Sequence, residues 1–210
     1  TYPLSLFIFR RDLRLPDNTG LIEALHTSEK VLPCFIFDKR QVGKENEYRS
    51  MNALQFMLES LEDLDTQLHE KDGRLYFFYG TPDEIIKKLI EEKKINAIFC
   101  NRDYTPFAIE RDKTIEKVCA DYDIPFHQYG DALLHEPEEI KNQSNAPFSV
   151  FTPFYKASLL KPIRKKASFP SSARFYRGHS NINESKDLLF KKIVPEKNDN
   201  LHVNGGRSVA

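Results

Sequence analysis

The sequence predicts an α/β fold in which a doubly wound, five-stranded parallel sheet carries helices on both faces. Up to residue 135, short apolar runs alternate with longer amphipathic stretches, which is the order of strands and helices in a parallel sheet. The runs are continuously apolar, as is typical of strands covered on both faces. The fold class is therefore Rossmann-like, although the glycine-rich turn that often follows a first strand is absent.

Five apolar runs are the expected strands, and they lie at residues 4–9, 31–37, 75–79, 97–100 and 126–129. Helix starts fall between them. Pro16, Asp17 and Asn18 open the first helix, while Thr81 and Thr105 each precede a proline and are expected to cap later helices. A helix is also expected over residues 51–68, whose leucines recur at helical spacing and should lie in the core. These leucines are Leu54, Leu58, Leu61, Leu64 and Leu68.

Composition indicates a protein with one good core and no membrane span. The chain has 210 residues, of which 40% are hydrophobic, and no apolar run approaches the ~20 residues that cross a bilayer. No signal-peptide pattern begins it, so we expect a cytoplasmic protein, or a nuclear one in a eukaryote. Cys34, Cys100 and Cys119 lie in apolar patterns without metal-ligand spacing, which predicts buried, inert thiols.

Charge is unevenly distributed along the chain. Residues 1–155 hold 19 basic and 27 acidic side chains, which gives −8, whereas residues 156–210 hold 12 and 4, which gives +8. The basic part could contact nucleic acid, or it could be a linker that lies on its own acidic domain. Pro162, Pro170 and Pro195, together with many Ser, Asn and Lys, predict that residues 157–200 are a largely irregular linker.

Charged turns follow the first and fourth strands, where an open sheet binds its ligands. The first strand runs into Arg10 and Arg11, and the fourth into Asn101, Asp103 and Tyr104. In doubly wound sheets the ligand crevice lies outside the carboxyl ends of the strands, where the strand order reverses. These turns therefore predict a ligand site, with a partner-docking surface as the alternative. The six histidines are scattered, and no catalytic triad or metal site is expected.

At this point the sequence resembles the N-terminal α/β domain of the DNA photolyase and cryptochrome family. The similar stretches occur in family order: FRRDLRLPDN at 9–18, NALQFMLESLEDL at 52–64, YGTPDEII at 79–86, NRDYTPFAIERD at 101–112 and PFSVFTPFYK at 147–156. The resemblance implies an antenna domain at 1–135, a closing helical segment at 136–156 and the interdomain linker at 157–200. Residues 201–210, LHVNGGRSVA, resemble the start of the family's helical FAD-binding domain.

The family implies light-driven repair of pyrimidine dimers in DNA, a lyase reaction driven by reduced FAD in the helical domain. We expect that domain to be absent from this chain, so that the 210 residues alone would be inactive, with the helical domain and damaged DNA as partners of the full-length protein. The chain contains no Trp, whereas the family's electron relay runs through tryptophans. The alternative is a cryptochrome-like blue-light signalling module that uses the same domain for partner docking.

The remaining role that the resemblance implies is to hold a light-harvesting chromophore. Family members that bind methenyltetrahydrofolate place a histidine and an acidic residue where this chain has Glu45 and Ala108. The mismatch favours a flavin or a deazaflavin over that folate, although an empty site stays open. The cofactor-binding residues expected from the strand-end rule and the resemblance are Phe9, Arg10, Arg11, Phe37, Asn101, Asp103 and Tyr104.

Two mutational expectations follow from this assignment. Neither Arg10 nor Arg11 belongs to the apolar core, so alanine at either position is expected to weaken chromophore binding and to leave the fold intact. The aromatic residues Phe148, Phe151 and Phe154 are expected at or near an exposed surface, with core packing as the alternative. Glu136, Glu138 and Glu139 are expected to form a solvated helix start.

Overall fold

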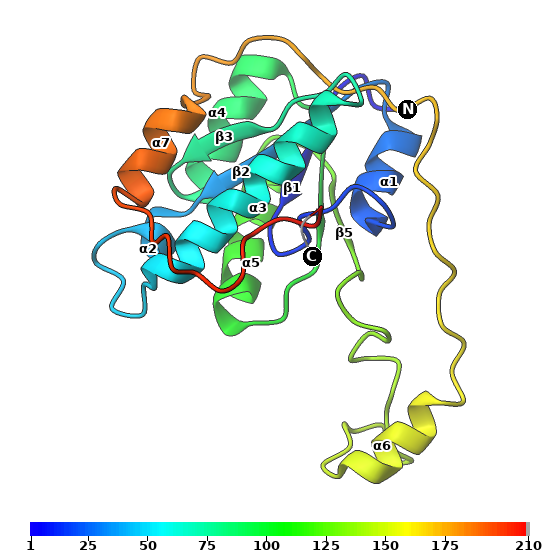
Figure 1. Cartoon of the computed structure of the whole chain (residues 1–210). Helices are drawn as coiled ribbons and strands as arrows, with labels where there is room; N and C mark the ends of the chain where they lie inside the picture. Colours follow the sequence, from blue (N-terminus) through cyan, green and yellow to red (C-terminus); the bar gives the residue numbers. More distant parts are fainter. Residues whose placement is uncertain (209–210) are drawn as a thin grey trace.

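The computed structural model describes residues 1–208 and contains the predicted sheet at its centre (Figure 1). All five strands are parallel, and their order is β3-β2-β1-β4-β5, so the order reverses between β1 and β4. This confirms the predicted fold class and the predicted reversal. The strands are β1 (Ser5–Phe9), β2 (Val31–Phe37), β3 (Tyr76–Tyr79), β4 (Ala97–Asn101) and β5 (Phe126–Tyr129).

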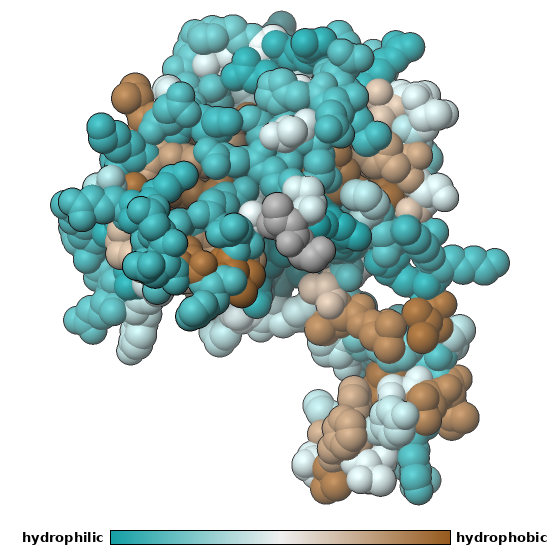
Figure 2. All heavy atoms as spheres, in the orientation of Figure 1, coloured by the Kyte–Doolittle hydropathy of each residue, from teal (hydrophilic) through white to brown (hydrophobic). Residues whose placement is uncertain are grey.

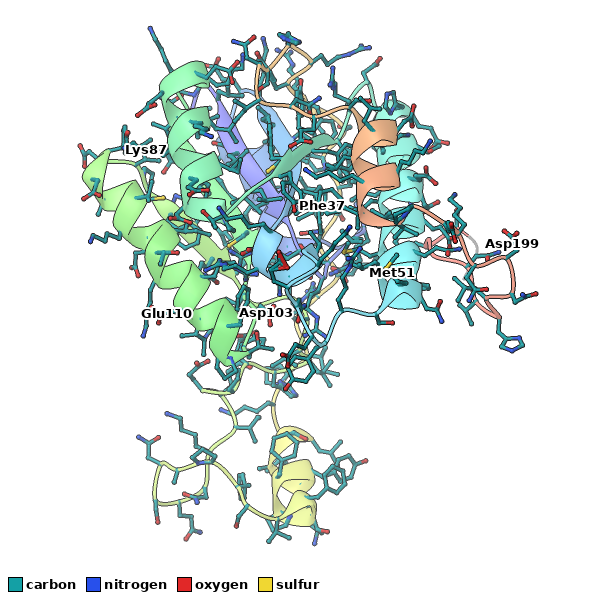
Figure 3. All side chains as sticks on the ribbon, turned by 90° about the vertical axis from the view of Figure 1, so that its left-hand side faces the viewer. Phe37, Met51, Lys87, Asp103, Glu110 and Asp199 are labelled. Atoms are coloured by element: carbon teal, nitrogen blue, oxygen red, sulfur yellow. The ribbon has the colours of Figure 1, made fainter. Side chains whose placement is uncertain are left out.

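Helices cover both faces of the sheet, as Figure 3 shows nearly edge-on for four of them. The helices are α1 (Thr19–Thr27), α2 (Lys39–Val42), α3 (Met51–His69), α4 (Pro82–Lys93), α5 (Pro106–Asp121), α6 (Phe151–Ser158) and α7 (Lys186–Ile193). Side chains of α1, α3 and α7 share one core cluster with the sheet, and those of α4 and α5 share another. The five leucines of α3 are buried in the first cluster, as their spacing predicts.

The caps explain where the helices begin. The side chain of Asn18 accepts a hydrogen bond from the Leu21 amide at 3.1 Å, and Thr105 caps α5 by accepting from Ala108 at 3.2 Å. Thr81 precedes Pro82 but its side chain caps nothing, so there the proline and two first-turn acids favour the helix. These starts place the polar turns after β1 and β4 directly against helix N-termini.

All three cysteines are buried and free, as predicted. Burial raises the pKa of Cys100 to about 11 and that of Cys119 to about 12. The thiolate is the reactive form, so these side chains are inert at neutral pH.

Residues 130–185 leave the body of the molecule and return to it, and they carry α6 at their far end (Figure 1). The residues from 136 to 150 form turns, and α6 begins only at Phe151. Residues 157–200 are largely irregular, as expected, but α7 is a helix within them. Leu189 and Ile193 bury that helix against the first core cluster. Phe175 also bridges to Val31, the first residue of β2.

Arg164 and Ala167 make the first contacts of the returning segment with the body. Arg164 pairs with Asp17 at 2.7 Å and lies 3.7 Å from Asp131, and the Ala167 amide donates to Asp17 at 2.8 Å. Toward the C-terminus, Gly205 donates to Glu59 at 2.7 Å, so the last described residues lie along α3. The resemblance at 201–210 extends to Val209 and Ala210, which lie outside the described residues.

The surface of α6 and its flanks is apolar (Figure 2). Phe151 is 72% exposed and Phe154 is 39% exposed, whereas Phe148 is half-buried against Phe154. Exposed aliphatic side chains continue the patch at Val150, Leu159, Leu160 and Ile163. The expectation of aromatic residues at a surface is therefore confirmed for Phe151 and Phe154.

Candidate functional site

Polar side chains meet where β1 and β4 end, and Asn101 holds them together. The Asn101 side-chain amide donates to Asp12 at 2.5 Å and to Asn18 at 2.8 Å, and its oxygen accepts from the Gly20 amide at 2.9 Å. A Cβ on Gly20 would lie 2.6 Å from that oxygen, so this close approach requires glycine. Asn101 therefore uses its side chain within the fold, and the predicted contact with a ligand finds no free group there.

Arg10 is also held within the protein. Its two terminal nitrogens donate to the Asp112 carboxylate at 2.9 and 2.7 Å, and one of them reaches the Asn101 carbonyl at 3.3 Å. Both partners of this ion pair are buried. The expectation that Arg10 is dispensable for the fold is contradicted, because its removal would take from the buried Asp112 carboxylate the arginine that binds it with two hydrogen bonds.

The other charged residues of the prediction lie at the surface of two adjoining hollows. The Arg11 side chain is 78% exposed and lies 3.9 Å from Asp103. Tyr104 donates its hydroxyl to Glu136 at 2.6–2.7 Å, and Arg102 pairs with Glu136 and Glu138. Burial and the bond to Glu136 raise the pKa of Tyr104. Of the carboxylates expected at a solvated helix start, Glu136 and Glu138 bind the loop after β4, whereas Glu139 accepts from the Glu136 amide, and no helix starts there.

The first hollow is a cavity of about 280 Å³ over the ends of β1 and β2, here called the β1–β2 cavity. Figure 3 shows two of its wall residues, Phe37 on the sheet and Asp103 beside the N-terminal end of α5. The wall consists of Ile8, Phe9, Arg10, Arg11, Phe35, Ile36, Phe37, Asp38, Gln41, Val42, Leu54, Met57, Pro82, Asp103, Arg111 and Ile115.

Five of the seven predicted residues therefore line the β1–β2 cavity. Asn101 and Tyr104 do not line it. They line the second hollow, which lies beside β4 and also contacts Arg10, Arg11 and Asp103. Phe9 and Phe37 belong to the core, with 1% and 0% exposure, so they form the floor of the cavity. The seven residues thus lie around two adjoining hollows at one end of the sheet, and their role in binding a chromophore stays a prediction.

Arg111 is the wall residue that sequence reasoning missed. It is 9% exposed, and its Nε donates to Asp112 at 3.1 Å, while its Nη2 is buried without a hydrogen-bond partner among residues 1–208. Burial and the like charge of Arg10 lower the pKa of Arg111. A buried donor without a partner costs about 1–3 kcal/mol, and more when it is charged, so an anionic acceptor in this cavity would be stabilised.

The segment after β2 borders the cavity and is tied to two helices. Asp38 caps α2 and pairs with Arg40 at 2.5 Å, and the Arg40 guanidinium lies 5.0 Å from the centre of the Phe107 ring at the start of α5. Lys39 reaches Glu84 of α4 at 3.6 Å. These contacts hold the α2 side of the cavity in position.

Comparison with known proteins identifies the family. The model of the DNA photolyase family matches residues 5–171, which is well over half of the chain. The chain belongs to the DNA photolyase family. It is 31% identical over 151 residues to the deoxyribodipyrimidine photo-lyase of Agrobacterium fabrum, a match that covers 71% of this chain and 30% of that protein. It is 36% identical over 142 residues to Cryptochrome-1 of Aedes aegypti, a match that covers 65% of this chain and 26% of that protein.

Solved structures of the DNA photolyase family share the fold. The photolyase of Sulfolobus tokodaii, whose structure is described as holding two FAD molecules with implication of a novel light-harvesting cofactor, is 36% identical, with a TM-score of 0.82. That match covers 98% of this chain and 44% of the other. A Synechocystis cryptochrome, at 21% identity and a TM-score of 0.86, has the same fold. The chain spans about half the length of its curated relatives or less, for example 54% of a Synechococcus protein and 26% of Cryptochrome-1 of Aedes aegypti.

In this chain of the DNA photolyase family, the described residues contain neither a metal site nor a membrane span. No group of three or more potential ligands from His, Cys, Asp and Glu lies together within residues 1–208. No helix in the same part is long and apolar enough to cross a bilayer. The two positions at which folate-binding family members were expected to have a histidine and an acidic residue differ in burial here: Glu45 is exposed and Ala108 is fully buried.

Proposed function

We propose that this chain is the chromophore-binding α/β domain of a photolyase-family protein, with a flavin or deazaflavin antenna in the β1–β2 cavity. The observation that carries the proposal is Arg111, which lines the cavity and whose buried Nη2 has no acceptor within residues 1–208. The Sulfolobus relative supports it, because its structure is described as holding two FAD molecules with implication of a novel light-harvesting cofactor. The specific chromophore is part of the proposal.

The residues present fit an aromatic, anionic ligand. Phe35, Leu54 and Met57 offer an apolar wall for a ring system, and Arg11 and Arg111 offer cations for a phosphate or carboxylate tail. When bound, the chromophore would absorb light and pass the excitation energy to FAD. The part of the protein is to bind it, orient it and keep water out. A folate held as in other family members fits less well, because Glu45 and Ala108 supply neither of the expected groups.

The repair reaction belongs to the longer proteins of the family. We propose that light-driven repair of pyrimidine dimers requires FAD in a helical domain, which residues 1–208 do not contain. The domain limits of 1–135, 136–156 and 157–200, the docking of the helical domain, the binding of damaged DNA and a cytoplasmic or nuclear location are parts of this proposal. The 210 residues alone should produce no light-dependent loss of pyrimidine dimers above a protein-free control.

A second candidate function is a cryptochrome-like signalling module in which this domain docks partners. The exposed apolar side chains around α6 favour it, as does the 36% identity to Cryptochrome-1 of Aedes aegypti. The two functions differ in how they use the cavity, since docking at α6 requires no chromophore.

The first prediction tests chromophore binding by equilibrium dialysis against FMN. Wild type should bind, and Arg111→Ala should weaken binding by about tenfold to a hundredfold, since a hydrogen bond to a charged group contributes ~1.5–3 kcal/mol. The fold should be kept, because Asp112 retains Arg10 and Gln128 as partners. Lys113→Ala, on the outer surface of the same helix, is the matched control and should bind as wild type does. Equal affinity of Arg111→Ala and wild type would remove the cavity as the site.

A further inference from the structure

The segment that returns from α6 to the body carries an exposed serine directly after a run of basic residues. Residues 161–168 read KPIRKKAS, and they contain neither helix nor strand (Figure 1). Ser168 is exposed, and so are Lys165 and Lys166 on its N-terminal side. The segment therefore offers a hydroxyl group and two ammonium groups to solvent on one irregular stretch of backbone.

An exposed, irregular, basic segment of this kind has the chemistry of a protein kinase substrate. The kinase transfers the γ-phosphoryl group of Mg-ATP: the bond from the γ-phosphorus to the bridging oxygen breaks, and a bond from that phosphorus to the serine oxygen forms. ADP leaves, and the hydroxyl proton passes to the catalytic aspartate of the kinase. Kinases with an acidic substrate groove select basic residues before the serine, because the charges are complementary.

Ser168 lies where a free part of the chain joins a packed part. On its C-terminal side, Phe169 packs against the first core cluster. On its N-terminal side, the Ala167 amide donates to the Asp17 carboxylate at 2.8 Å, and Arg164 pairs with the same carboxylate at 2.7 Å. The hydroxyl group is thus next to the contact that ties the segment to the turn after β1.

A phosphate at Ser168 would act against that contact in two ways. It would bring about −1.5 to −2 charges close to Asp17, which repels them, and to Asp131, which lies 3.7 Å from Arg164. It would also attract the Arg164 guanidinium, since arginine forms strong paired hydrogen bonds with phosphate. The packing of Phe169 is apolar, so it should persist while the charged contact is lost.

We propose that Ser168 is the phosphate acceptor for a serine kinase that selects basic residues, and that its phosphorylation detaches the returning segment from Asp17. The site is separate from the β1–β2 cavity, and the proposal goes beyond the proposed function, since it requires no chromophore. The coupling is reciprocal: if the phosphate weakens the contact, then weakening the contact must favour the modification.

The first experiment measures the modification with the catalytic subunit of cyclic-AMP-dependent protein kinase and Mg-ATP as the probe. Mass spectrometry should locate phosphate at Ser168 of wild type, and Ser168→Ala should lose this label. Lys165→Ala combined with Lys166→Ala should slow labelling by about tenfold or more, because hydrogen bonds between charged groups are lost. Lys87→Ala with Lys88→Ala, an exposed lysine pair on α4, is the matched control and should be labelled as wild type is.

A second variant tests the reciprocal effect on the rate. Asp17→Asn removes the charge that holds Arg164, and it should be labelled about two- to fivefold faster than wild type. Asp17 has a φ of 56°, a left-handed conformation that asparagine also adopts, so the fold should be kept. A rate equal to that of wild type would overturn the coupling between the contact and the modification.

The last experiment reads the detachment by hydrogen exchange, measured by NMR at neutral pH on the phosphorylated and the unmodified chain. The Ala167 amide should exchange faster after phosphorylation, because its bond to Asp17 is lost. The Gly20 amide, bonded to the buried Asn101, should stay protected in both forms. Unchanged exchange at Ala167 in the phosphorylated chain would overturn the detachment. A wild type that is not labelled at Ser168, or is labelled as fast without the two lysines, would overturn the site.

Discussion

At the scale of single residues, Arg10 and Arg111 share one carboxylate but contribute differently. Arg10 makes a two-pronged pair with Asp112 and a third bond to the Asn101 carbonyl. Arg111 makes one bond to Asp112 and leaves a terminal nitrogen without a partner among residues 1–208. Arg10 therefore ties the turn after β1 to β4 and α5, and Arg111 is the cation that we propose for ligand binding.

The second prediction is that Arg10→Ala destabilises the fold. Removing one partner of a buried ion pair typically costs about 3–5 kcal/mol, because the other charge stays buried. Urea denaturation should show this loss, whereas Arg11→Ala should stay within ~0.5 kcal/mol of wild type, as is usual for an exposed side chain. Equal unfolding midpoints for the two variants would contradict the assignment of Arg10 to the framework.

The sequence predicted polar residues at this end of the sheet but not Arg111, and the reason is physical. Charged residues after β1 and β4 marked the polar end of the sheet, yet Arg10 and Asn101 turned out to bind other parts of the protein. Arg111 was missed because arginine within a helix is usually exposed. One signal was present: Arg111 lies on the stripe of Ala108, Ile115 and Cys119, which recurs at helical spacing and is buried.

At the scale of elements, the segment that returns from α6 is held by Arg164. Its hydrogen bond to Asp17 is the main cause that lowers the pKa of Asp17 below its ordinary value of 3.8. The Ala167 amide donates to the same carboxylate. A carboxyl with a lowered pKa stabilises the folded state above its unfolded pKa, and this stabilisation is lost as pH falls through the lowered value. The contact of Arg164 and Ala167 with Asp17 should therefore persist at neutral pH and weaken in acid.

The third prediction follows from that contact and is read by NMR at the Ala167 amide. Its chemical shift should titrate with a midpoint below pH 3.8 in wild type. Arg164→Ala should move the midpoint up toward 3.8, since the lowering hydrogen bond is removed. A wild-type midpoint at or above that value would mean that Arg164 does not hold Asp17 in solution.

The strands could be predicted because each is short, apolar and bounded by turn residues. The helix α7 could not, because prolines and polar residues dominate the composition of residues 157–200. Its stability comes from Leu189 and Ile193 packing on the core cluster of α3, which is a tertiary contact that local composition does not reveal.

At the scale of the whole molecule, the apolar arm around α6 stands away from the body (Figures 1 and 2). Solved relatives match 98% of this chain with TM-scores of 0.82 and 0.86, although each is more than twice as long. The arm thus recurs in proteins with much additional structure. Its exposed rings and leucines are suited to burial against such structure.

The fourth prediction is that this chain associates through the arm when nothing else covers it. Phe151 is 72% exposed and Leu160 is 85% exposed, and exposed apolar patches of this kind promote association. Sedimentation velocity should show concentration-dependent association of wild type, and Phe151→Ser combined with Leu160→Ser should reduce it. Lys87→Ser with Lys88→Ser on α4 is the control pair and should associate as wild type does. A monomeric wild type at high concentration would refute this role of the arm.

The central claim is that the β1–β2 cavity holds the chromophore, and a crystal structure of the chain with bound FMN tests it most directly. The account predicts flavin density over the ends of β1 and β2, with the ring against Phe35 and an anionic group within hydrogen-bond distance of Arg111 Nη2. Density in the second hollow beside β4, or a flavin bound elsewhere while the cavity holds only water, would contradict it.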